Sequence, residues 1–381
     1  MNSHFLLLMT KSYIPYFLNQ PDFRIPQNIT TDILKEKDAL AFHLSLAEYQ
    51  HTPLISLPAL AKHLGIGKLF VKDESKRFGL NAFKGLGASF AVFQILQDKP
   101  DMKVFCTATD GNHGRAVAWA AQKFGKEAVV FVPSDTTSNR IQAIEKEGAK
   151  VIQLNKNYDD TCAYAEEMSI KNNWELVQDT AWEGYETIPA LIMAGYLTQF
   201  KELETDLHPR EFPEVDVVFL QVGVGSWAGA AAYYYLQRYS SKGPALISVE
   251  PEGSSGLLDS FRSSQRVVPN NPSYTIMAGL NCGIPSLSGW ELLKNAISVS
   301  LNIPDIQVEE AIRCLYYPLE DDPRIISGES GAAGLAGLLA MMQDPVFQPV
   351  RQQLDIGPHS RILVFNTEGD TDKESFQKII S

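Results

Sequence analysis

The feature that most limits the fold is a regular alternation of strand-like and helix-like segments between residues 103 and 180. Short apolar runs predict strands at 103–109 (KVFCTAT), 127–133 (EAVVFVP), 150–154 (KVIQL) and 174–180 (WELVQDT). The stretches between them, at 114–125, 139–148 and 159–173, predict helices. Because strands joined through helices return in the same direction by right-handed crossovers, this rhythm indicates a parallel sheet.

A second alternation starts near residue 215. It predicts strands at 215–223, 244–251 and 360–370, with a helix at 228–240. We therefore expect an α/β fold with two blocks and a crevice between them. Ligands of such folds bind beyond the carboxyl ends of the strands, so the turns after the strands are where chemistry is expected.

Net charge, segment length and residue spacing argue against several classes of function. The 381 residues carry a formal net charge of -12, which argues against nucleic acid as a general partner. FLLLM at 5–9 is too short for a signal peptide or a membrane span. No CxxC or HExxH spacing occurs, so we expect no metal site. The cysteines are far apart in the chain, which favours a reduced, cytoplasmic protein.

The turn ATDGNHG (108–114) follows a strand and opens a helix. Gly111 and Gly114 allow a ligand to approach the backbone, and the helix start offers free N–H groups to an anion. Asn112 and His113 add polar side chains. The simpler alternative is that Asp110 or Asn112 only caps the helix.

The turn QVGVGSWAG (221–229) is the second candidate. Gly223, Gly225 and Ser226 make a good phosphate cradle before a helix. A glycine turn followed by a strand that ends in Glu250 also resembles a dinucleotide site, although the spacing is GxGxxxG rather than GxGxxG. An NAD-dependent dehydrogenase is therefore an alternative.

Two further turns are less specific. In SGESGAAG (327–334), Ser330 is expected to be a helix N-cap. In FNTEGD (365–370), polar residues cluster after a core strand, with Thr367, Glu368 and Asp370 among them.

Lys84 lies in an apolar, glycine-rich segment, FGLNAFKGLGA (78–88). A desolvated lysine is expected to have a lowered pKa and to become a nucleophile that forms a Schiff base with an aldehyde. The alternative is a surface lysine whose stem packs on Phe83. A nucleophilic lysine together with a phosphate cradle suits a phosphorylated aldehyde such as pyridoxal phosphate.

These segments together resemble the fold-type II pyridoxal-phosphate enzymes, the tryptophan synthase β family. NAFKGLGA resembles the Schiff-base segment, which implies that Lys84 binds the cofactor. GNHG resembles the loop whose Asn112 contacts the pyridine ring oxygen. VGVGS resembles the phosphate loop, which implies a role for Gly223, Val224, Gly225 and Ser226. Thr367 falls where relatives place a hydroxyl or thiol near the pyridine nitrogen.

Four segments narrow the resemblance to the diaminopropionate ammonia-lyase family: ATDGNHGRAVAWAA, QDTAWEGYE, AGLNCGIPS and FNTEGDTD. The resemblance implies a carbon–nitrogen lyase that splits 2,3-diaminopropionate into pyruvate and two ammonia molecules by α,β-elimination. Asp110 and Asp179 are then the functional carboxylates, able to pair with the β-ammonium group or to take the Cα proton. Alternatively, Asp179 only caps the turn that follows it.

The resemblance also implies a small α/β domain of residues 86–195 and a large cofactor-binding domain of residues 1–85 and 196–381, with Lys84 at their junction. It implies a homodimer that acts on a small amino acid. A serine or threonine dehydratase, another β-eliminating lyase, and a non-enzymatic ligand-binding regulator remain open.

Overall fold

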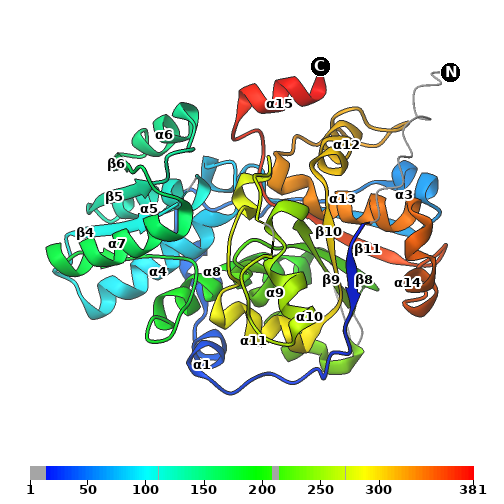
Figure 1. Ribbon diagram of the computed structural model, residues 1–381, viewed down its shortest axis with the longest axis horizontal. Coiled ribbons are helices and arrows are strands. Elements are labelled where there is room, and N and C mark those ends of the chain that lie inside the picture. The colour runs from blue at the N-terminus through cyan, green and yellow to red at the C-terminus, as the bar shows by residue number, and fades with distance from the viewer. Residues whose placement is uncertain (1–13, 110, 208–213, 271) are drawn as a thin grey trace.

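A computed structural model describes residues 14–109, 111–207, 214–270 and 272–381. The chain forms one four-stranded and one seven-stranded sheet, which lie on the left and the right of Figure 1. The four-stranded sheet is wholly parallel, in the order β6-β5-β4-β7. The five central strands of the larger sheet are also parallel. The prediction of an α/β fold with two mainly parallel sheets is confirmed.

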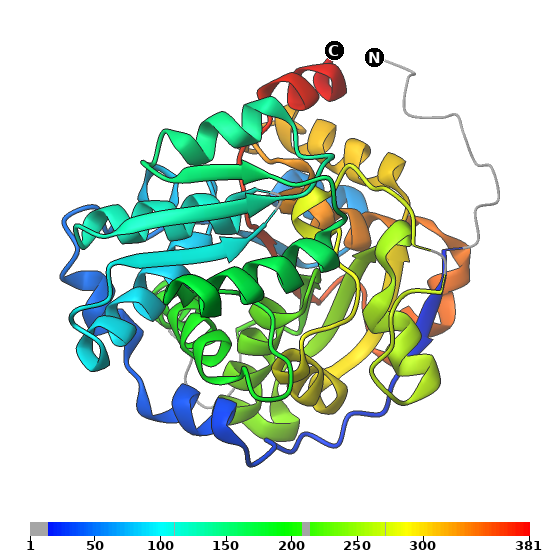
Figure 2. The same cartoon turned by 60° about the vertical axis from the view of Figure 1, so that its left-hand side comes forward.

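The smaller sheet follows the predicted alternation closely. Figure 2 shows it between its covering helices. Its strands are β4 (Val104–Ala108), β5 (Glu127–Val132), β6 (Lys150–Gln153) and β7 (Glu175–Leu176). The connecting helices are α5 (Asn112–Lys123), α6 (Ser138–Glu145) and α7 (Tyr158–Asn172).

Strand β7 is shorter than the predicted 174–180. The side chain of Gln178 takes over the pairing with β4: its amide oxygen accepts from Ala108 N at 3.0 Å, and its amide nitrogen donates to Ala108 O at 2.9 Å. The backbone is thereby released from the sheet just before Asp179, which can turn its side chain toward the centre of the molecule.

The larger sheet has the order β1-β10-β9-β8-β11-β3-β2, with antiparallel strands only at its two edges. Its strands are β1 (Tyr16–Leu18), β2 (Leu54–Ser56), β3 (Lys68–Asp73), β8 (Val217–Gln221), β9 (Ala245–Pro251), β10 (Ile297–Ile303) and β11 (Arg361–Asn366). The sequence analysis found β8, β9 and β11 and missed the others. β3 (KLFVKD) contains charged residues, and β10 (ISVSLNI) follows a helix directly.

The remaining helices pack around the two sheets and against one another. The longer ones are α4 (Lys84–Asp98), α8 (Thr187–Leu207), α9 (Ser226–Tyr239), α11 (Leu287–Ala296), α12 (Asp305–Tyr316) and α13 (Glu329–Gln343). The shorter ones are α1 (Ile29–Glu36), α2 (Ala39–Leu44), α3 (Pro58–Leu64), α10 (Gly256–Ser263), α14 (Gln348–Gln353) and α15 (Lys373–Ile380).

The position of α4, which begins at Lys84, is fixed by close packing against α8. A Cβ atom on Gly195 would collide with the carbonyl oxygen of Leu86, so only glycine at 195 allows the two helices to approach this closely. His43 adds a buried anchor, because its Nε2 lies 3.0 Å from Leu86 O and its Nδ1 lies 2.7 Å from Thr198 Oγ1.

The segment just before Lys84 is held by a buried ionic network. Arg77 is 1% exposed and donates to Glu74 at 2.7 Å and to Glu202 of α8, also at 2.7 Å. Lys72 pairs with the same Glu202 at 2.8 Å. Buried charges are tolerated only when they are paired in this way, so the network ties the lysine-bearing segment to α8.

The predicted domain boundaries stay a prediction. The four-stranded sheet lies inside the range 86–195, whereas α4 starts before it and α8 ends after it. All four cysteines are among the described residues, and none of them forms a disulfide bond. Within the described ranges, no helix is long and apolar enough to cross a membrane, and no cluster of His, Cys, Asp or Glu is arranged to hold a metal ion. FLLLM at 5–9 lies outside the described residues.

Candidate active site

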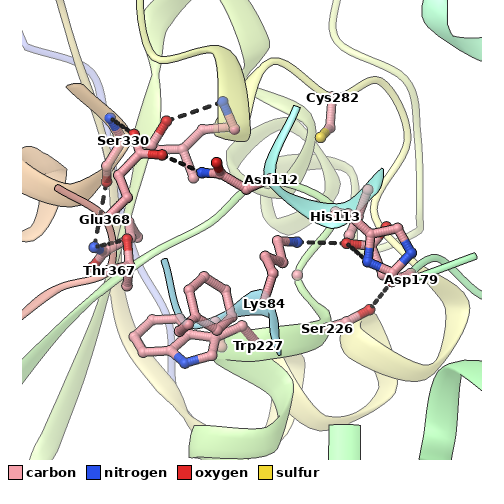
Figure 3. Close-up of a pocket in the computed structure, with 18 of the residues that line it drawn as sticks. Lys84, Asn112, His113, Asp179, Ser226, Trp227, Cys282, Ser330, Thr367 and Glu368 are labelled. Atoms are coloured by element: carbon pink, nitrogen blue, oxygen red, sulfur yellow. Dashed lines mark hydrogen bonds and ion pairs between the residues drawn. The ribbon is translucent and has the colours of Figure 1, made fainter. Parts of the chain in front are cut away.

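A pocket lies where the carboxyl ends of strands from both sheets face each other (Figure 3). Its wall is formed by residues that follow the ends of β4, β7, β8 and β11. The first residues of α4, α5, α9 and α13 also line it. The predicted catalytic and cofactor-binding residues that line this pocket are Lys84, Asn112, Asp179, Gly223, Val224, Gly225, Ser226 and Thr367. Asp110 lies outside the described residues.

Lys84 and Asp179 form a close ion pair in this pocket. Lys84 Nζ donates to Asp179 Oδ2 at 2.5 Å, and the two side chains are 17% and 5% exposed. The Asp179 backbone is fixed as well, because Ser226 Oγ donates to its carbonyl oxygen at 2.5 Å. The Asp179 carboxylate therefore binds Lys84 across 95 residues of sequence, which is more than a turn cap requires.

His113 lies on the other side of the same carboxylate. Its Nε2 lies 2.8 Å from Val177 O, so this nitrogen carries the proton, and its Nδ1 lies 3.7 Å from Asp179 Oδ2. Burial lowers the pKa of His113. The ring is therefore neutral near pH 7, and Lys84 is the cation that balances Asp179.

The ion pair sets the protonation of both partners. Burial works to raise the pKa of Asp179, but its neighbours His113 and Lys84, together with the hydrogen bond from Lys84, lower it to about 2. Burial works to lower the pKa of Lys84, but the neighbouring Asp179 raises it above its usual range. The expectation of a lowered lysine pKa is therefore wrong for this state of the protein. Lys84 must give up a proton before it can attack a carbonyl.

The turn between β8 and α9 has the form of an anion cradle. Gly225 has φ +89°, a left-handed conformation that favours glycine, and it starts α9 without any side-chain cap. The first N–H groups of this helix therefore remain for a ligand. Gly223 leaves room beside the turn, since a Cβ there would lie 3.2 Å from Cys282 Sγ. A phosphate group fits this arrangement.

On the opposite wall, Asn112 reaches across to the larger sheet. Its Nδ2 donates to Glu368 Oε2, and Glu368 Oε1 accepts from Ser330 N at 3.0 Å. The proposal that Ser330 caps a helix was wrong: α13 begins at Glu329, with Gly328 as its N-cap, and Ser330 Oγ instead accepts from Gly279 N at 3.0 Å. In α5 the N-cap is Gly111, without a side-chain cap, so Asn112 does not cap that helix.

Thr367 lies at the end of β11 beside Gln221. Gln221 Nε2 donates to Thr367 Oγ1 at 3.0 Å, and both side chains are buried. Because the threonine oxygen accepts this bond, its own hydroxyl proton is available to an acceptor in the pocket.

Glu250, the acidic residue of the dinucleotide alternative, serves the structure instead. Its two carboxylate oxygens accept from Leu257 N at 2.7 Å and Leu258 N at 2.8 Å, at the start of α10. Burial raises its pKa to about 8. Glu250 does not line the pocket, so it has no place in binding a ribose there.

The sequence analysis missed three polar residues of the pocket, Tyr158, Gln221 and Cys282. Gln221 carried a usable signal, since it is a polar residue at the end of an otherwise apolar strand, just before the glycine turn. Tyr158 is the first residue of α7 and also follows a strand end. Cys282 lies in AGLNCGIPS, one of the four segments that carry the resemblance, but the resemblance gave this residue no role of its own.

Comparisons with known proteins agree with this geometry. Residues 46–349 match the family model described as pyridoxal-phosphate dependent enzyme. The diaminopropionate ammonia-lyase of Escherichia coli K12 is 40% identical over 361 residues, which cover 90% of each chain. The crystal structure of the Escherichia coli enzyme in complex with D-serine has a TM-score of 0.86 and 36% identity, over 96% of this chain and 97% of that one. A catabolic L-threonine dehydratase of Staphylococcus aureus is 27% identical over 76% of this chain and 78% of its own.

Proposed function

The chain belongs to the diaminopropionate ammonia-lyase family of pyridoxal-phosphate-dependent enzymes, and on this premise we propose that it converts 2,3-diaminopropionate and water into pyruvate and two ammonia molecules. The observation that carries the proposal is the pairing of Lys84 with Asp179 in a pocket whose other end is a glycine cradle. An amine and an anion site at two ends of one pocket suit a phosphorylated aldehyde.

The residues present fit pyridoxal phosphate. The N–H groups of the turn from Gly223 to Ser226 would hold its phosphate, and Lys84 would bond to its aldehyde. Asn112 would contact the ring oxygen, and the Thr367 hydroxyl would donate to the ring nitrogen. When bound, the cofactor supplies an electron-withdrawing ring that stabilises negative charge at the substrate Cα.

Asp179 has two tasks in this proposal. It holds the Lys84 ammonium in place, and it is the nearest acceptor for the proton that Lys84 must lose before it can act as a nucleophile or a base. Lys84 can then take the proton from one face of Cα. A carboxylate at Asp110 would serve the other face, so that both D- and L-diaminopropionate are substrates.

Charge in the pocket favours a substrate with two ammonium groups. Among the described lining residues, Asp179 and Glu368 are acidic and only Lys84 is a cation, because His113 is neutral. The β-ammonium of diaminopropionate gains from this excess of negative charge, whereas the hydroxyl of serine or threonine does not. The β-nitrogen also leaves readily as neutral ammonia when it arrives protonated.

The first experiment is to map the lysine that binds the cofactor. Purified protein is reduced with borohydride and digested, and the peptide that gains the phosphopyridoxyl mass is identified. We expect the label on the peptide that contains Lys84. Label on another lysine would contradict the site, and a protein without a visible cofactor band would contradict the proposed function.

The second experiment identifies the substrate. Pyruvate release is measured with D- and L-diaminopropionate and L-serine, and 2-oxobutyrate release with L-threonine. We expect diaminopropionate to be preferred in kcat/KM over both hydroxy amino acids. A preference for serine or threonine would instead support the alternative that the protein is a dehydratase. The similarity to the threonine dehydratase of Staphylococcus aureus is the reason to test this alternative.

We further propose that the protein acts as a homodimer in the cytoplasm. The absence of disulfide bonds among its four described cysteines is compatible with a reducing compartment. Light scattering coupled to size-exclusion chromatography should give twice the mass of the 42.3 kDa chain. A mass of one chain at micromolar concentration would rule out the dimer.

A further inference from the structure

Glu368 is a buried carboxylate of the pocket that the proposed reaction does not use. It is 6% exposed and forms no ion pair with any of the residues that the structure describes. Its partners are neutral donors: Ser330 N at 3.0 Å, Asn112 Nδ2, and Thr371 Oγ1 at 3.4 Å. A buried charge held only by neutral groups is costly, so its presence calls for a role beyond packing.

The donors and acceptors around Glu368 fix the orientation of Asn112. An ionised carboxylate only accepts hydrogen bonds, so the nitrogen of the Asn112 amide must face Glu368. The Asn112 oxygen then points the other way, and one N–H remains for another acceptor. Without Glu368, the two ends of this amide would be nearly interchangeable.

Glu368 is itself held in place from the larger sheet. It follows Thr367 at the end of β11, and its second oxygen is bound by the backbone N–H of Ser330 in the first turn of α13. The start of a helix favours a negative charge, so this contact helps to hold the Glu368 side chain in its orientation. A chain of contacts thus runs from α13 through Glu368 to Asn112 on α5, from one sheet to the other (Figure 3).

We propose that Glu368 is a positioning residue that turns the Asn112 amide so that its remaining N–H is presented to the ring oxygen of pyridoxal phosphate. This inference rests on the proposed function, because it concerns how the same pocket holds that cofactor. A residue that only capped α13 would stabilise the fold without any dependence on Asn112, and this difference makes the proposal testable.

The test is a double-mutant cycle on cofactor binding. Glu368→Ala, Asn112→Ala and the double variant are prepared without cofactor, and the Kd for pyridoxal phosphate is measured by absorbance titration. A charge-assisted hydrogen bond of this kind corresponds to about a tenfold to hundredfold change in affinity. We expect each single variant to bind about tenfold or more weakly, and the double variant to match Asn112→Ala within about twofold.

The visible absorption maximum of the bound cofactor gives a second readout. Asn112→Ala should shift this maximum, Glu368→Ala should shift it in the same direction, and the double variant should shift it no further. Asp370→Asn is the matched control, because it removes a carboxylate from the same turn that does not line the pocket. This control should keep the wild-type affinity and maximum.

Three outcomes would overturn the inference. If the losses of cofactor affinity in the two single variants add up in the double variant, Glu368 only caps α13. If Glu368→Ala binds the cofactor with unchanged affinity, Glu368 has no role in cofactor binding. A wild type that binds no pyridoxal phosphate would overturn the proposed function together with the inference. If Glu368→Ala does not fold, the same cycle is run with Glu368→Gln, whose single amide oxygen can serve Asn112 or Ser330 but not both, and which should give a smaller loss in the same pattern.

Discussion

Replacing Asp179 with asparagine should change the state of Lys84 in a way that can be followed without any substrate. In the structure, the Lys84 ammonium lies 2.5 Å from the Asp179 carboxylate, and both side chains are largely buried. The pKa of Asp179 falls from 3.8 to about 2, a shift of nearly two units. Since each unit corresponds to about 1.4 kcal/mol, the ionised state of Asp179 is favoured in the folded protein by roughly 2–3 kcal/mol.

The sign of the pH dependence follows from this lowered pKa. A carboxyl whose pKa is depressed by folding stabilises the protein fully above its unfolded pKa of 3.8, and this contribution is lost as the pH falls through about 2. In cofactor-free protein, urea unfolding should therefore show Asp179→Asn to be less stable by about 2 kcal/mol from pH 5 to 8. The difference should shrink as the pH falls from 4 to 2.

The amine of Lys84 should respond in the opposite direction. Asp179 is what raises the pKa of Lys84, and burial is what opposes it. With asparagine at 179, burial prevails and the pKa of Lys84 should fall below its ordinary value of 10.5. Competitive labelling of cofactor-free protein with an amine-reactive anhydride, read by peptide mass spectrometry between pH 7 and 11, measures this change. Lys84 should be slow to label in the wild type and faster in the variant.

Lys99 and Glu175 provide the matched control. They form an ion pair of 2.7 Å, but the Lys99 side chain is 55% exposed. Exposed pairs contribute little, so Glu175→Gln should leave the labelling of Lys99 and the stability nearly unchanged. The reasoning would be refuted if Lys84 labelled at the same rate in wild type and Asp179→Asn. It would also be refuted if Glu175→Gln changed the labelling of Lys99 and the stability as much as Asp179→Asn changes the labelling of Lys84 and the stability.

Three further variants test other parts of the structure. Arg77→Met leaves Glu74 buried without its cation and Glu202 paired with Lys72 alone, so it should lower the free energy of unfolding by about 3–5 kcal/mol in urea titrations; a loss below about 1 kcal/mol would mean that the network is solvated. Gly225→Asp places a negative charge beside the phosphate cradle at φ +89°, so cofactor affinity in absorbance titrations should fall strongly, and wild-type affinity would move the phosphate site elsewhere. Asp110→Asn should keep the cofactor but lose activity unequally toward D- and L-diaminopropionate, and an unchanged substrate preference would leave Asp110 without a catalytic role.

Much of the fold could be predicted because the strands of α/β proteins carry a local signal. Residues 127–133 and 244–251 are dominated by apolar residues, and the observed strands β5 and β9 match them within one residue at each end. β3 was not predicted because its sequence, KLFVKD, has only three apolar residues between charged ones, yet Lys72 is fully buried. Its burial depends on Glu202, a partner 130 residues away, which no local pattern can reveal.

The location of the pocket could be predicted for a related reason. Parallel strands place their carboxyl ends on one edge, so turns that are distant in sequence meet in space. Lys84, Asn112, Asp179 and Thr367 all line the pocket, as this rule requires. This rule does not predict which side chains contact each other, and therefore it does not predict which charges are paired.

The two acidic residues of the described pocket illustrate why this missing information decides function. Asp179 and Glu368 both follow strand ends, and this position alone gives no reason to treat them differently. In the structure, Asp179 binds the Lys84 ammonium, so its charge is balanced and its place is beside the group that exchanges protons. Glu368 is bound by two N–H groups and a hydroxyl, none of which carries charge, so its contacts hold neighbouring groups in place rather than balance a cation. A proton acceptor for Lys84 and a fixed anion for orientation are different roles, and the difference lies entirely in the donors that each carboxylate meets.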